Sequence, residues 1–231
     1  MSQQEDLKKQ AALRAVTLVA SGMTVGLGTG STATHFVAEL GRRLAAGELA
    51  RVAGVPTSRA TARQATALGI PLVEVPTAGV DLAVDGMDEY DDDLDAIKGL
   101  GGALLREKIV AASAATFVLI GDSSKHVKRL GEKAPLPVEV ATFGWQRTAA
   151  ALAGLGAVPA LRRGGDQPFV TDNGNYVLDC RFPGGLEPKA VARALCDVPG
   201  VLGHGLFLGI ARQAFVATED GVVELTSGAA R

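Results

Sequence analysis

The first half of the chain alternates between short apolar runs and segments in which apolar residues recur every three or four positions. Short apolar runs predict buried strands, and the three-to-four spacing predicts amphipathic helices. The pattern places helices at 5–20, 32–44, 59–68 and 104–115, and strands at 24–27, 52–55, 72–75, 80–84 and 116–120. Strands that alternate with helices are typical of a parallel, doubly wound sheet, so we predict an α/β fold with a Rossmann-like main domain.

The pattern changes after Lys133. Segment 134–140 (APLPVEV) holds two prolines, which are typical of a domain boundary or an edge strand. Segment 172–175 (DNGN) predicts a turn between hairpin strands. The predicted elements from here on are strands at 134–140, 158–161, 169–171, 176–179 and 201–208 and helices at 146–155 and 188–196. With the short hairpin strand at 169–171 set aside, their order is βαββαβ, which predicts a smaller ferredoxin-like α+β subdomain.

We therefore predict a catalytic α/β domain made of residues 1–133 and 208–231, and the subdomain at 134–207. The last two predicted strands, 214–217 and 221–225, return to the main sheet.

Composition excludes several classes of protein. Hydrophobic residues make up 47% of the 231 residues, which is enough for a substantial core. The net charge of -2 argues against a nucleic-acid partner. No apolar run approaches the ~20 residues that span a bilayer, and the charged N-terminal segment lacks a signal region, so we expect a cytoplasmic protein. The basic pairs Arg42–Arg43 and Arg162–Arg163 are short, and we expect solvated surface there.

The two cysteines, Cys180 and Cys196, are too few for a disulfide framework or a four-cysteine zinc site. Both lie in segments with an apolar pattern, so we expect two buried free thiols.

The segment Gly26–Thr32 (GLGTGST) joins a predicted strand to a predicted helix. Its glycines stand at positions one, three and five rather than one, three and six, and no acidic residue ends a strand about 20 residues later, which argues against a dinucleotide. Glycine amides, the hydroxyls of Ser31 and Thr32 and the helix N-terminus instead predict a phosphate site. The alternative is a tight turn without a ligand.

The segment 84–108 is rich in acidic residues and glycines. Asp85 and Asp88 follow a predicted strand at the edge where such sheets bind ligands. Asp91–Asp95 lacks the glycine and glutamate positions of a calcium loop, and we expect a solvated turn. Lys98 precedes glycines that can present backbone amides to an anion. Glu107 either complements a helix dipole, for about 0.3–1 kcal/mol, or acts as a general base beside the two aspartates.

Four motifs, in this order, resemble the ribose-5-phosphate isomerase A family over essentially the whole chain: VGLGTGST, VDGMDE, KGLGGALLREK and PLPVEV. The resemblance implies interconversion of D-ribose 5-phosphate and D-ribulose 5-phosphate in the non-oxidative pentose phosphate pathway, without a metal or an organic cofactor. It implies Glu107 as the group that moves a proton between C2 and C1 through an ene-diol(ate), assisted by Asp85, Asp88 and Lys98. The substrate-binding residues that it implies are Lys8, Thr29, Gly30, Ser31, Thr32, Asp85, Gly86, Met87, Asp88, Lys98, Gly99, Leu100, Gly101 and Lys125. It also implies a homodimer or homotetramer.

The chain departs from the family pattern at a few positions. Leu100 stands where relatives carry a glycine, which requires a negative φ and a side chain that points away from substrate. Met87 and Tyr90 stand where smaller or aliphatic residues are usual, which bears on packing and KM more than on the reaction.

Two other functions stay open. The first is a sugar-phosphate sensor without turnover, although about 23 residues before the first strand are too few for a helix-turn-helix module. The second is an amino-sugar phosphate deaminase or CoA-transferase of similar fold. A deaminase needs a catalytic histidine, and His35, His126 and His204 lie outside the dense motifs. We expect a packing or surface role for His35, and His126 stays unassigned.

Overall fold

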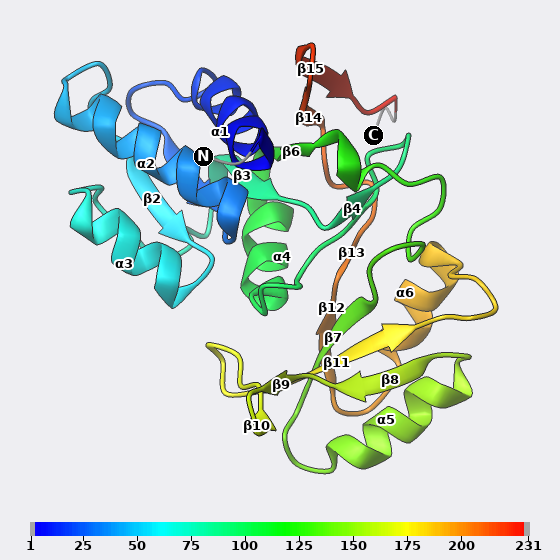
Figure 1. The fold of residues 1–231 in the computed structure, drawn as a ribbon. Helices are drawn as coiled ribbons and strands as arrows, with labels where there is room; N and C mark the ends of the chain where they lie inside the picture. Colours follow the sequence, from blue (N-terminus) through cyan, green and yellow to red (C-terminus); the bar gives the residue numbers. More distant parts are fainter. Residues whose placement is uncertain (1–2, 229–231) are drawn as a thin grey trace. The chain divides into compact units, whose positions relative to one another are not determined.

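The computed structural model describes residues 3–228, which divide into two compact units (Figure 1). Unit 1 contains the residues up to Met87, Arg106–Lys125 and the residues from Gly209 onward. Unit 2 contains Asp88–Leu105 and His126–Leu208. The segment 88–105 thus belongs to unit 2, although it precedes residue 134, so the acidic and glycine-rich segment 84–108 is shared by the two units.

Unit 1 is built on a six-stranded sheet with the order β15-β14-β6-β3-β1-β2. Its strands are β1 (Thr24–Leu27), β2 (Ala53–Pro56), β3 (Val80–Gly86), β6 (Ala114–Asp122), β14 (Gln213–Thr218) and β15 (Gly221–Thr226). All neighbours are parallel except β14 and β15. The predicted parallel, doubly wound sheet is confirmed, and the last two strands return to it as expected.

Helices cover both faces of this sheet. They are α1 (Gln3–Val16), α2 (Ser31–Ala45), α3 (Arg59–Ala67) and α4 (Leu104–Ser113), most of which belongs to unit 1. Figure 1 shows α1 and α2 side by side, and Leu27 of β1 packs with Phe36 of α2 in the core on that side. On the opposite face a side chain at Gly26 would meet Val110 of α4 at 2.4 Å. The glycine therefore lets α4 approach β1 closely.

Unit 2 contains a four-stranded antiparallel sheet with the order β12-β7-β11-β8. Its elements are β7 (Leu136–Val140), α5 (Trp145–Gly154), β8 (Val158–Leu161), β11 (Tyr176–Arg181), α6 (Pro188–Cys196) and β12 (Val201–His204). This order confirms the ferredoxin-like prediction. Alternate residues of β7 face the helices, where Val138 packs in a core with Leu152 and Leu195.

Shorter elements complete the chain. They are β4 (Glu89–Tyr90), β5 (Ala96–Ile97), the 3-10 turn η1 (Ser123–Lys125), β9 (Arg163–Gly164), β10 (Gln167–Pro168) and β13 (Leu206–Phe207). Strands β13, β5 and β4 form a separate small sheet in unit 2, and β9 pairs with β10.

Two predicted strands are wrong. In segment 72–75 the structure forms only an isolated bridge between Leu72 and Gly54. Prolines flank this edge segment at positions 71 and 76 and remove backbone donors. The DNGN turn is present, since the Thr171 amide donates to the Asn175 carbonyl at 2.9 Å. Residues 169–171 form no strand, however, and β11 pairs with β7 and β8 instead.

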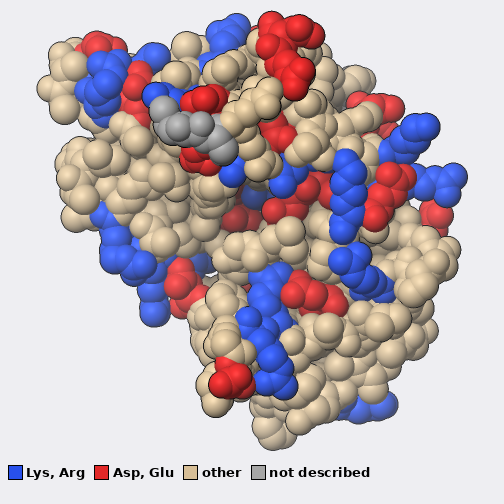
Figure 2. All heavy atoms as spheres, in the orientation of Figure 1, with Lys and Arg blue, Asp and Glu red and all other residues tan. Residues whose placement is uncertain are grey.

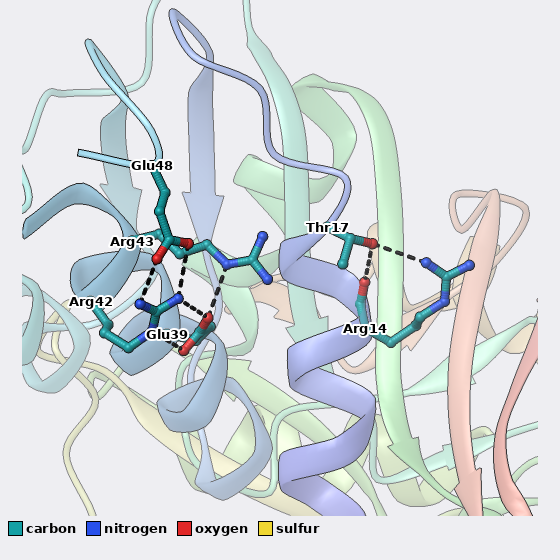
Figure 3. Close-up of polar contacts among 6 residues, drawn as sticks. All are labelled: Arg14, Thr17, Glu39, Arg42, Arg43 and Glu48. Atoms are coloured by element: carbon teal, nitrogen blue, oxygen red, sulfur yellow. Dashed lines mark hydrogen bonds and ion pairs between the residues drawn. The ribbon is translucent and has the colours of Figure 1, made fainter. Parts of the chain in front are cut away.

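The first helix ends earlier than predicted, at Val16 rather than residue 20. The Thr17 amide and hydroxyl both donate to the Arg14 carbonyl, at 3.2 and 2.7 Å (Figure 3). Such a short turn satisfies the carbonyls of a helix end and stops its continuation.

Several charged side chains on the surface pair with one another. Figure 2 shows basic and acidic side chains intermixed on the face in view. Arg42, which is half exposed as predicted, bonds to Glu39 and to Glu48 (Figure 3). The Arg42 guanidinium lowers the pKa of the Glu39 carboxyl to about 2. Among residues 3–228, no helix is both long and apolar enough to cross a membrane.

Candidate active site

The order of the unit 1 sheet reverses between β1 and β3. Strand β2 lies on one side of β1, whereas the next strand of the sheet, β3, lies on the other. Ligands of such sheets bind at the carboxyl ends of the strands at this reversal. The loop at 28–30 follows β1 there, and Asp85 and Gly86 end β3.

The glycine loop leaves a helix N-terminus without a side-chain cap. Helix α2 begins at Ser31 after Gly30, whose φ of 113° favours glycine, and no side chain accepts from its first amides. The first amides of a helix lack carbonyl partners within it, and the helix dipole favours an anion. Ser31 is exposed and Thr32 half-buried, whereas the Thr29 hydroxyl bonds to Thr57 at 2.7 Å. This end of α2 is suited to hold a phosphate.

Asp85 is almost fully buried at the end of β3, with 3% of its surface exposed. Its Oδ1 atom accepts from the amides of Thr29, at 3.0 Å, and Gly86, at 2.7 Å. A Cβ on Gly28 would lie 2.3 Å from that oxygen. Gly28 therefore allows the loop backbone to close over the carboxylate.

Glu107 lies on α4 and is also 3% exposed. It lines the same small pocket of unit 1 as Asp85, together with Gly26, Gly28 and Thr57. The structure thus brings together two carboxylates that stand 22 positions apart in the sequence. Two buried carboxylates that border one small interior gap are candidates for proton transfer to a sugar bound next to them.

The two predicted phosphate lysines also belong to unit 1. Lys125 is half-buried at the end of η1, three residues after β6 ends. Lys8 lies on α1, with its Nζ atom 3.5 Å from Glu5. Glu5 also bonds to His35 at 2.7 Å, and this bond lowers the pKa of the Glu5 carboxyl. His35 therefore takes part in a surface network rather than lining the pocket of Asp85.

Of the remaining predicted residues, Met87 is buried in unit 1, and the others belong to unit 2, where Asp88 meets the loop at residues 99–101. The Asp88 Oδ2 atom accepts from the Leu100 amide at 2.9 Å. Lys98 is 2% exposed, and its ammonium lies 5.4 Å from the centre of the Phe207 ring. Gly99 has a φ of 103°.

Leu100 meets the condition that its side chain imposes on the backbone. In the described part of the chain, the non-glycine residues with positive φ are Arg51 and Leu94, so Leu100 is not among them. Its side chain is 43% exposed. The departure from glycine therefore causes no backbone strain.

The acidic turn at 91–95 is local structure, as predicted. The Asp91 carboxylate accepts from the amides of Asp93 and Asp95, and burial beside Asp95 raises the pKa of the Asp91 carboxyl. Asp92 is exposed and bonds to His126 at 2.7 Å. Within residues 3–228 no group of three or more His, Cys, Asp or Glu side chains could hold a metal ion.

Two expectations about single residues, for Cys196 and Arg162, need correction. Cys180 is buried as expected, and burial raises the pKa of its thiol to about 12. Cys196, the last residue of α6, is exposed. Arg162 is not solvated surface: its side chain is 12% exposed and pairs with Asp179. Glu89, which the sequence did not single out, is fully buried and accepts three backbone amides.

The fold and these side chains define an α/β protein with two buried carboxylates at the reversal of its parallel sheet. The family model of ribose 5-phosphate isomerase A (phosphoriboisomerase A) matches residues 53–221. The chain belongs to the ribose 5-phosphate isomerase A family.

Relatives across distant organisms agree with this assignment. Ribose-5-phosphate isomerase A of Roseiflexus sp. strain RS-1 is 55% identical over 97% of each chain. The protein of the same name from Deinococcus radiodurans is 50% identical over 96% of this chain and 98% of its own. Among solved structures, ribose 5-phosphate isomerase from Plasmodium falciparum has a TM-score of 0.94 and 36% identity, covering 97% of this chain and 100% of its own. A D-ribose-5-phosphate isomerase in complex with phospho-erythronic acid also has a TM-score of 0.94, with 38% identity and the same coverage.

Proposed function

We propose that the chain interconverts D-ribose 5-phosphate and D-ribulose 5-phosphate, with Glu107 moving a proton between C2 and C1. Family membership supports the reaction. The observation that carries the assignment of residues is that the buried carboxylates of Asp85 and Glu107 line one pocket at the sheet reversal. An aldose–ketose isomerase needs one base for the carbon-bound proton and donors for the oxygen that becomes negatively charged.

The phosphate of the substrate binds at the N-terminus of α2. The amides and hydroxyls at 30–32 donate to the phosphate oxygens, and the uncapped helix start supports this role. Lys8 and Lys125 add positive charge. Binding energy at the phosphate, which does not react, orients C1 and C2 for proton transfer.

The reaction has three steps: ring opening, removal of the C2 proton and return of a proton to C1. Asp85 exchanges a proton with the ring oxygen and so helps to open the furanose. Glu107 then removes the C2 proton, a C1–C2 double bond forms, and O1 becomes negatively charged. Return of the proton from Glu107 to C1, with transfer of the O2 proton to O1, gives the ketose.

The proposal assigns Asp88, Lys98 and the amides of residues 99–101 to the same reaction. The Lys98 ammonium and the loop amides stabilise the charge on O1, and Asp88 accepts from a substrate hydroxyl. Gly86 and Met87 contribute backbone and packing beside Asp85. These assignments follow the family motifs residue by residue.

The substitution Glu107→Gln tests the central assignment. It keeps the size of the side chain and removes the base, so kcat should fall by about 10³-fold or more. Phospho-erythronic acid, which a related isomerase binds, reports binding separately, and its affinity should change by less than about fivefold. A matched control is Glu74→Gln at an exposed position. If the Glu107→Gln enzyme kept kcat within about tenfold of wild type, Glu107 would not be the base.

We further propose that the protein assembles as a homodimer or homotetramer. Large apolar side chains on the surface of unit 2 support this proposal, since Phe143 is 95% and Val158 58% exposed. Sedimentation equilibrium at micromolar concentration measures the mass of the assembly. A monomer under these conditions would contradict the proposal.

A further inference from the structure

Arg162 is held in a fixed orientation within unit 2. It directly follows β8, and its Nε atom donates to Asp179 Oδ2 of β11 at 2.9 Å while Nη2 donates to Oδ1. The guanidinium also lies 5.8 Å from the centre of the Phe169 ring. A planar guanidinium bound at two atoms by a carboxylate and stacked on a ring has little freedom to rotate.

The third nitrogen of this guanidinium, Nη1, bonds to the loop at residues 99–101. Its Nη1 atom donates to the carbonyls of Gly99 and Leu100, each at 2.9 Å. In a trans peptide the carbonyl and the next amide point in opposite directions. With the Gly99 carbonyl facing Arg162, the Leu100 amide faces away and donates to Asp88 at 2.9 Å. The Leu100 carbonyl in the same way turns the Gly101 amide away from Arg162.

The loop depends on such external contacts because glycine restricts its backbone so little. Gly99 and Gly102 adopt φ values of 103° and 79°, and glycine populates both signs of φ about equally. A Cβ on Gly102 would lie 2.4 Å from the Phe169 ring. The ring on which Arg162 stacks therefore also packs against the loop backbone.

We infer that Arg162 is a positioning residue for the isomerisation: it directs two consecutive amides of the 99–101 loop toward the Asp88 side, and Asp179 and Phe169 hold it in place. This inference rests on the proposed roles of the Gly101 amide, in stabilising the negative charge on O1, and of Asp88, which the Leu100 amide holds, in binding a substrate hydroxyl. A lysine cannot replace the arginine, because an ammonium on a flexible stem lacks the planar fork that reaches both carbonyls and the carboxylate.

The neighbouring Arg163 provides a matched control. It is exposed on β9, and its Nη1 atom donates to the Asp166 carbonyl in the same short hairpin. Arg162→Lys and Arg163→Lys make the same chemical change one residue apart. Only Arg162→Lys removes bonds to the loop at residues 99–101.

The experiment compares both variants with wild type in turnover and in binding. For Arg162→Lys, kcat should fall by about 10- to 100-fold with KM within about threefold, because misdirected donors affect the charged intermediate more than phosphate binding. Calorimetry should show affinity for phospho-erythronic acid, whose carboxylate mimics the ene-diolate, weakened by about tenfold or more. Affinity for inorganic phosphate should stay within about twofold, and Arg163→Lys should match wild type in every measurement.

Several outcomes would overturn the inference. One is a kcat and an affinity for phospho-erythronic acid within about threefold of wild type in folded Arg162→Lys. Loss of the folded state, seen as a lost near-UV signal, or an equal loss of phosphate affinity would show that Arg162 supports the structure generally. Failure of the proposed function itself looks different, because wild type would then bind phospho-erythronic acid without forming D-ribulose 5-phosphate.

Discussion

Gly28→Ala tests whether the position of Asp85 limits activity. A Cβ at residue 28 would lie 2.3 Å from Asp85 Oδ1, 2.4 Å from Cγ and 2.6 Å from Cα. Ordinary contacts between carbon atoms are about 3.5–4.0 Å. Rotation of the carboxylate cannot relieve the contact with Cα, because Cα is part of the backbone of β3. Residue 85 must therefore move away by about 1 Å.

Both stability and activity should respond to this displacement. Overpacking of this kind costs about 1–3 kcal/mol of the free energy of unfolding. A displacement of about 1 Å at a catalytic group can reduce the rate about 100-fold. The bond from the Thr29 amide to Asp85, 3.0 Å long, would be distorted as well. We expect kcat/KM to fall by about 100-fold, with most molecules still folded.

Gly54→Ala in β2 provides the control. Its Cβ would meet Leu27 Cδ1 at 2.6 Å, a comparably close contact, but with the end of a side chain that can rotate. This variant should lose about 1–2 kcal/mol in urea unfolding and keep kcat/KM within about threefold. Wild-type kcat/KM in Gly28→Ala, or an equal loss of activity in both variants, would refute the reasoning.

Three further predictions concern stability and reactivity. Glu89→Gln should reduce the free energy of unfolding by about 3–5 kcal/mol. The fully buried carboxylate accepts hydrogen bonds from three backbone N–H groups on its two oxygens. A glutamine has only one acceptor oxygen, and its NH2 group would face one of these donors. Arg42 lowers the pKa of Glu39 from 4.5 to about 2. This pair therefore stabilises the fold above pH 4.5, and its contribution disappears as the pH falls toward 2. Glu39→Gln should reduce the free energy of unfolding by about 1 kcal/mol at pH 7, because Arg42 is half exposed. A thiol reagent should modify exposed Cys196 in the native protein and buried Cys180 only after unfolding.

For each of these predictions, one experimental result would contradict it. The control for Glu89→Gln is Glu132→Gln, at an exposed position in the loop whose amides bind Glu89. Equal urea midpoints for the two variants would contradict the first prediction. An acid-induced loss of stability unchanged by Glu39→Gln would contradict the second. Modification of both thiols in the native protein at equal rates would contradict the third.

The parallel sheet and the glycine-rich turn between β1 and α2 were predictable because they depend on local sequence. Periods of two and 3.6 residues distinguish strands from helices without knowledge of the fold. The failure at 72–75 shows the limit, because an apolar run between prolines forms a strand only if a neighbour offers a complete set of partners. The segment at 169–171 failed for a related reason: the turn at 171–175 formed locally, but β11 found its partners in β7 and β8.

The candidate site shows the same division. The glycine-rich turn at 26–32, the aspartates at 85 and 88 and the start of α4 stand out in the sequence, because turns, strand ends and helix starts have characteristic residues. That Asp85 and Glu107 face one pocket depends on how α4 packs across β1 and β3. Arg162 gave no signal, since Arg162 and Arg163 are alike in the sequence and only the tertiary contacts of the first distinguish them.

Hydrophobic periodicity and turn chemistry act over a few residues, so the two sheet architectures, the family motifs and the residue types available for proton transfer could be predicted from the chain alone. The tertiary structure decided which of those residues are buried together and which serve as supports. Gly28 against Asp85, Glu89 in its ring of amides and Arg162 on the carbonyls of Gly99 and Leu100 all join positions far apart in the chain. Close packing and the need to pair buried polar groups select such contacts only once the whole chain has folded.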